Sequence, residues 1–123
     1  MKASRVGSYG LGPQSVDLYL REDDGGEFYV IPEAGKTPRI VVGADYDSWY
    51  RVVEVAHHEA MELAMTMIGA RYQPAPDNGN DHGSYVFVMT HAQFSEASAR
   101  TAQFLAASLP DLSRAWAKWR KGK

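Results

Sequence analysis

Two neighbouring turns of one predicted helix carry the residue types best suited to chemistry. The segment VAHHEAMELAM, residues 55–65, places His58 and Glu62 four positions apart. Side chains at positions i and i+4 lie on one helix face, so an imidazole nitrogen and a carboxylate oxygen there could hold a single cation. The chain has no cysteine, which excludes thiolate metal sites and thiol catalysis. A metal ion would therefore be held by His, Asp and Glu.

The segment His58-Glu59-Ala60-Met61-Glu62 resembles the His-Glu-x-x-His helix of zincin metallopeptidases, with Glu in place of the second His. The resemblance implies that His58 and Glu62 are metal ligands and that Glu59 is the general base that activates water. It also implies a peptide or amide bond as the substrate. A carboxylate in place of imidazole keeps an oxygen ligand available but weakens the argument for zinc. Zinc stays the expected divalent ion, and Mn²⁺ or Fe²⁺ is left open.

A metal site needs at least one more ligand, and three further histidines are available. His91 follows the last predicted strand at the start of a helix, a common place for functional residues. His82 lies in a glycine-containing turn and is an alternative ligand. His57 points about 100° away from His58 around the helix, where it could support the ligands from behind or simply border the sheet.

A solvated ridge is the competing interpretation of the same residues. Glu54, His58 and Glu62 recur at helical spacing, and a buried Glu could pair with Arg71 or Arg100 instead of a metal. The apolar residues around the ridge favour partial burial, and a buried carboxylate or imidazole needs a partner. A cation and an arginine both stay open as that partner.

The sequence pattern of the N-terminal half of the chain predicts β-strands. Residues 1–13 are rich in glycine and predict a flexible arm or irregular loop. Residues 15–22 alternate apolar and polar side chains, a turn follows at 23–26, and residues 27–32 continue as a second strand. Together they predict an antiparallel β-hairpin. Residues 39–42 predict a third, more buried strand.

The C-terminal half predicts helices. Asp45 or Asp47 would cap a long central helix that reaches about residue 71, with an apolar stripe laid on the sheet. After a further strand, Thr90 opens the first of two C-terminal helices with a capping box, and Pro110 suits the first turn of the second. The fold class is thus α+β, with an N-terminal antiparallel β-hairpin or small sheet packed on a long central helix, then a strand and two helices.

Composition bounds the class of protein. A chain of 123 residues is expected to form one domain over residues 1–123, with 120–123 as a disordered tail. The start lacks the apolar segment of a secretory signal, and no apolar run approaches the ~20 residues that cross a bilayer, so the expected location is the cytoplasm. The net charge of −2 argues against a nucleic-acid-binding protein, although basic residues gather in 111–123.

Three functions stay open, and only the first makes the chain an enzyme. The first is a metal-dependent hydrolase of zincin-like type with one divalent cation and a small molecule or peptide as substrate. The second is a non-catalytic binding protein, such as an accessory factor of a mobile element. Tyr19 and Tyr29 fall on the predicted outer face of the hairpin, where a second subunit or a partner protein could cover them. The third is a nucleic-acid accessory that uses the basic C-terminal segment with Trp116 and Trp119.

Overall fold

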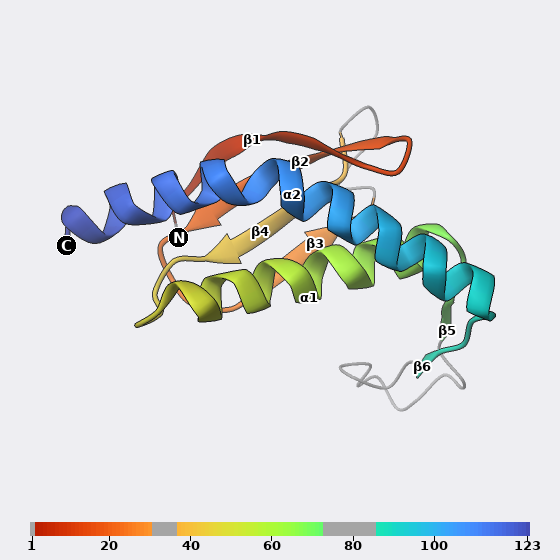
Figure 1. Cartoon of the computed structure of the whole chain (residues 1–123). Coiled ribbons are helices and arrows are strands. Elements are labelled where there is room, and N and C mark those ends of the chain that lie inside the picture. Colours follow the sequence, from red (N-terminus) through yellow and green to blue (C-terminus); the bar gives the residue numbers. More distant parts are fainter. Residues whose placement is uncertain (1, 31–36, 73–85) are drawn as a thin grey trace.

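The structure is a computed structural model that describes residues 2–30, 37–72 and 86–123 (Figure 1). Within these ranges the chain is mixed α+β, which confirms the predicted class. A four-stranded sheet lies behind two helices that share one of its faces (Figure 1). The described elements are, in order, β1 (Ala3–Leu11), β2 (Gln14–Arg21), β3 (Gly26–Tyr29), β4 (Arg39–Gly43), α1 (Trp49–Met67), β5 (Arg71–Tyr72), β6 (Val86–Phe87) and α2 (His91–Lys121).

The order of strands in the sheet is β1-β2-β4-β3, so the predicted hairpin between residues 15–22 and 27–32 is wrong. β4 lies between β2 and β3, parallel to β2 and antiparallel to β3. The apolar side chains explain this order, because Ile40 and Val42 are fully buried and belong in the middle of the sheet. The prediction of a buried strand at residues 39–42 is confirmed.

The connection from β2 to β3 passes over the end of β4 instead of closing a hairpin. The Gly43 amide donates a hydrogen bond of 2.7 Å to the carbonyl of Gly25, and the Ala44 amide donates one of 2.8 Å to the carbonyl of Arg21. A Cβ on Gly43 would lie 2.5 Å from the carbonyl oxygen of Asp23, so the crossing requires glycine there. Gly25 has a φ of 81°, a left-handed conformation that glycine adopts without strain.

The hairpin of this fold is β1–β2, which contradicts the predicted arm over residues 1–13. β1 is the edge strand next to β2, and the turn between them contains Gly12 at a φ of 65°. The missing side chains of its glycines hide the alternation that marks a strand. Tyr9 nevertheless packs edge to face on Phe104 of α2 at 5.9 Å, and Leu11 is fully buried. The strand is therefore held by its contacts with α2.

Helix α1 begins later and ends earlier than predicted. Ser48, and neither Asp45 nor Asp47, is the N-cap, since its side-chain oxygen accepts a hydrogen bond from the Arg51 amide. The helix ends at Met67, before residue 71. The predicted apolar stripe is confirmed at its centre by the buried residues Val52, Ala56, Ala60, Leu63 and Ala64.

Helix α2 is one continuous helix, so the predicted break at Pro110 is wrong. The predicted capping box of Thr90 and Gln93 is present at its start. Proline inside a helix costs about 3 kcal/mol through the lost hydrogen bond. Phe104 before Pro110 and Leu112 after it are both fully buried, and this burial outweighs that cost. The helix continues to Lys121, so most of the predicted disordered tail at 120–123 is helix or its cap.

Of the last predicted strand, at residues 84–90, the structure describes the part from residue 86 onward. This part contains β6, which pairs with β5 in a separate two-stranded ladder. α1 packs on β3 and β4, while α2 packs on β1 and on α1. One core between the helices and the sheet contains the buried apolar residues. No helix of the described residues is both long enough and apolar enough to cross a membrane.

Candidate metal centre

Helix α1 places three potential metal ligands where it borders β3. Glu59 follows the buried Ala56 by three residues and precedes the buried Leu63 by four, so it lies on the packed side of the helix. His58 lies one residue back and points toward solvent, with 65% of its side chain exposed. Glu62 is in between, with 15% of its side chain exposed.

These three side chains come together, and the proximity of His58 and Glu62 is the part that their spacing predicts. A nitrogen or carboxylate oxygen from each of His58, Glu59 and Glu62 lies within 4.8 Å of the others. His58 Nε2 and Glu62 Oε2 are 2.8 Å apart. One imidazole and two carboxylates are a donor set that suits Zn²⁺, Mn²⁺ or Fe²⁺.

Glu59 is the most unusual member of the group, because it is an acidic residue that is only 7% exposed. Burial raises its pKa from 4.5 to about 7, with smaller contributions from the nearby Glu62 and Glu27, while His58 lowers it. The described residues form no hydrogen bond to this carboxyl group. A buried carboxylate without a donor is costly, and a cation would compensate it.

Gly26 in β3 makes room for Glu59 and was missed as a site residue. A Cβ on Gly26 would lie 2.6 Å from Cγ1 of Val55, 3.0 Å from Cγ of Glu59 and 3.2 Å from its Oε2. A cleft of about 310 Å³ opens at this place, lined by Gly25, Gly26, Arg51, Glu54, Val55, His58 and Glu59. The Gly25-Gly26 pair was a visible signal in the sequence, but it predicted only a turn.

The two other histidines that the structure describes are not part of the group. His57 is exposed and is absent from the cluster of ligand atoms. His91 is the exposed first residue of α2, and it also lies outside that cluster. His82 lies outside the described residues, so its predicted role is untouched by the structure. The described chain thus brings together His58 and Glu62 without the predicted third ligand His91, and adds Glu59.

The predicted solvated ridge is divided between two environments. Glu54 is exposed and its Oε1 accepts a hydrogen bond of 2.7 Å from Nη1 of Arg51. Arg100, a predicted alternative partner, instead pairs with Glu96 at 2.7 Å. The side chain of Arg71 lies outside the part of the chain that the structure describes. Glu54 and His58 are therefore exposed, as a surface ridge requires, while the side chain of Glu62 is only 15% exposed.

The helix-free face of the sheet carries the two predicted interface tyrosines. The Arg39 guanidinium lies over the ring of Tyr29 at 4.7 Å and near that of Tyr19 at 5.9 Å. Its Nε is buried and has no hydrogen-bond partner among the described residues. A hollow of about 300 Å³ here is lined by Ala3, Tyr19, Arg21, Glu27, Tyr29, Arg39 and Val41. The prediction that both tyrosines share an outer face holds, although the hairpin that suggested it does not form.

No protein-family model, no curated protein and no solved structure matches this chain. The zincin resemblance is therefore limited to the proximity of His58, Glu59 and Glu62 on one helix.

Proposed function

We propose that the protein is a divalent-metal-dependent hydrolase whose cation is held by His58, Glu62 and one further ligand, with Glu59 as the general base. The observation that carries this proposal is the largely buried residue Glu59, whose carboxyl group accepts no hydrogen bond from the described residues and lies in one cluster with an imidazole and a second carboxylate. Such a group is costly in an ordinary surface ridge and useful in a metal centre.

The chemistry divides between the cation and the protein. A bound divalent cation polarises a substrate oxygen and makes water more acidic. Glu59 accepts a proton, and its place beside the two ligands suits this role, because a general base must lie within hydrogen-bond reach of the proton that it takes. The cleft beside Gly25 and Gly26 gives a substrate access to Glu59 without side chains from those two positions.

The first experiment measures metal binding to untagged protein by calorimetry with Zn²⁺ and Mn²⁺. His58→Ala should weaken binding more than about tenfold, since even groups behind a ligand contribute that much. His57→Ala is the matched control, because His57 is the adjacent exposed imidazole outside the cluster. Equal affinity of wild type and His58→Ala would contradict the proposal.

A second experiment separates metal binding from hydrolysis. Glu59→Gln should keep most of the metal affinity and lower hydrolysis of chromogenic ester and amide substrates by about 10²–10⁴-fold, the usual contribution of a general base. If Glu59→Gln loses the metal as well, Glu59 is a ligand. If metal-loaded wild type hydrolyses nothing in the panel, the centre has another use.

A non-catalytic binding protein is the second candidate, and the helix-free sheet face favours it. Arg39 has no carboxylate partner among the described residues, whereas Arg5 and Arg21 each have one on the same sheet. A second copy of the chain that presents a carboxylate to Arg39 between Tyr19 and Tyr29 would supply it. Light scattering at high concentration should then give a dimer that Tyr29→Ala dissociates, and a strict monomer would remove this candidate.

A further inference from the structure

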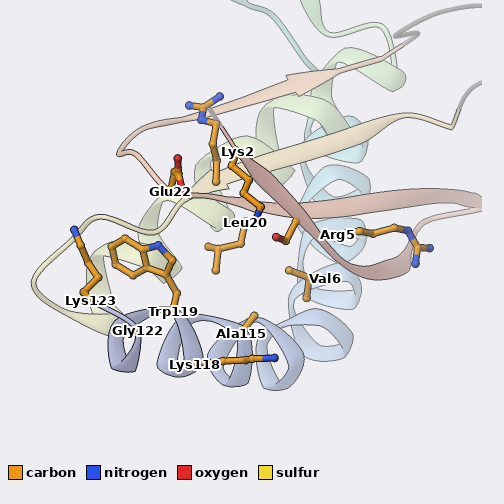
Figure 2. A pocket seen from close by; sticks show the side chains of 12 residues that line it. Lys2, Arg5, Val6, Leu20, Glu22, Ala115, Lys118, Trp119, Gly122 and Lys123 are labelled. Atoms are coloured by element: carbon orange, nitrogen blue, oxygen red, sulfur yellow. The ribbon is translucent and has the colours of Figure 1, made fainter.

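A basic pocket lies between the β1–β2 hairpin and the C-terminal end of α2, and it shares no residue with the metal centre. Its volume is about 500 Å³, within the range of sites that hold small-molecule ligands. Figure 2 shows the side chains of Val6 and Leu20 facing Ala115 and Trp119 across it. Apolar side chains thus make the walls of the pocket.

The rim of the pocket is positively charged. Lysine and arginine line it at Lys2, Arg5, Arg21, Lys118 and Lys123, against the one acidic lining residue Glu22. Arg5 and Arg21 are matched by carboxylates elsewhere on the sheet. Lys123 Nζ lies 3.7 Å from Oδ1 of Asp45, a pair that is exposed and therefore weak.

Lys2 and Lys118 carry the uncompensated charge. Neither forms an ion pair with any described residue, and they approach the pocket from opposite sides, one from the strand end and one from the helix (Figure 2). The net charge of the chain is −2, so this positive potential is local and does not reflect the whole molecule.

We propose that this pocket binds a nucleotide, with its phosphate between Lys2 and Lys118 and its base against Trp119. Lysines are compact charges that suit phosphate, and an indole offers a flat surface on which any base can stack. Lys123 Nζ lies 4.6 Å from the centre of the Trp119 ring, so one face of the indole is already near a cation. The volume exceeds what a phosphate alone would fill, and the apolar walls call for a ring.

Calorimetry with adenosine monophosphate tests the proposal on the full chain, with adenosine and inorganic phosphate as separate arms. Adenosine monophosphate should bind about tenfold or more tightly than either, because each lacks one of the two sets of contacts. A 5′-phosphorylated single-stranded oligonucleotide distinguishes a free nucleotide from the end of a nucleic-acid strand as the natural ligand. Tighter binding of the oligonucleotide indicates a strand end, and equal binding indicates the free nucleotide. Failure of adenosine monophosphate to bind, or adenosine binding equally well, would overturn the proposal.

Two variants distinguish specific binding in this pocket from non-specific attraction to surface charge. Lys118→Ala should weaken binding about tenfold, whereas Lys121→Ala, which removes an equal charge from the same helix outside the pocket, should not. Ala115→Leu keeps every charge but fills part of the pocket, so it should also weaken binding. Equal losses in Lys118→Ala and Lys121→Ala, with none in Ala115→Leu, would show non-specific attraction and refute the pocket.

Tryptophan fluorescence gives a second measurement of binding, which reports on contact between the ligand and Trp119. The chain has three tryptophans, and Trp116 is engaged elsewhere, since its indole N–H donates a hydrogen bond of 2.9 Å to the carbonyl of Ala44. Adenosine monophosphate should quench the wild type, and Trp119→Phe should abolish the quenching while the protein stays folded by circular dichroism. Undiminished quenching in Trp119→Phe would place the ligand elsewhere.

Discussion

Replacing Glu59 by Gln should change how the stability of the metal-free protein depends on pH. The folded state raises the pKa of this carboxyl group from 4.5 to about 7, mainly through burial. The folded protein therefore holds a proton on Glu59 more tightly than the unfolded chain does. Stability decreases as the pH rises from about 4.5 through 7, and it becomes level above that.

The magnitude follows from the size of the pKa change. At 1.36 kcal/mol per pH unit, the full penalty of ionising Glu59 in the folded state is about 3 kcal/mol. Most of it develops between pH 5 and 8.5, where we expect a change of about 2 to 3 kcal/mol. Gln has no charge to bury, so the stability of the Glu59→Gln variant relative to wild type should rise by that amount over the same pH interval. The buried amide adds a cost of its own that does not vary with pH.

Urea denaturation followed by circular dichroism, in chelator at several pH values, measures this difference. The other charged groups near Glu59, which are His58, Glu62 and Glu27, are present in both proteins, so the comparison isolates Glu59. Glu54→Gln is the control and should show no such pH dependence, because Glu54 is exposed and paired with Arg51. A constant difference between Glu59→Gln and wild type from pH 5 to 8.5 would refute the burial argument.

Three further substitutions test the packing that surrounds the centre. Gly26→Ala should cost about 1–3 kcal/mol in urea denaturation, because the new methyl group overlaps Val55 and Glu59; a neutral result would mean that β3 and α1 are less close. Pro110→Ala should raise the thermal midpoint and stabilise the protein by up to about 3 kcal/mol by restoring a helical hydrogen bond; a loss would mean that the ring is needed. Phe104→Ala should cost about 3–5 kcal/mol in the same denaturation experiment, because a fully buried ring leaves a cavity; a smaller cost would mean that the core collapses around it.

Local patterns in the sequence predicted the elements better than their arrangement. The alternation in β2, the apolar run of β4, the buried stripe of α1 and the capping box at Thr90 are all signals within one segment. The position of β4 between β2 and β3 depends on which strand buries most apolar surface, and this is a comparison between segments. A turn-like sequence at residues 23–26 is equally compatible with a hairpin and with a crossing over a third strand.

One strand and the continuity of one helix were predicted wrongly because the local sequence signal was weaker than the packing. β1 contains glycines where a strand would show side chains, and Val6, Tyr9 and Leu11 are its residues that reach the core. Pro110 is a strong local signal for a helix start, yet the helix continues because Phe104 and Leu112 on either side of it are buried in the same core. In both cases contacts with distant residues outweigh local preference.

In the candidate centre, too, one part follows from the local sequence and another part from the strand order. The proximity of His58 and Glu62 follows from helical spacing alone. The burial of Glu59 does not, because it requires β3 to lie at the sheet edge under α1, where Gly26 faces the helix. In the predicted hairpin β3 would adjoin β2, and this contact would have no reason to form. The strand order that the sequence did not predict is therefore what buries Glu59 and raises its pKa to about 7.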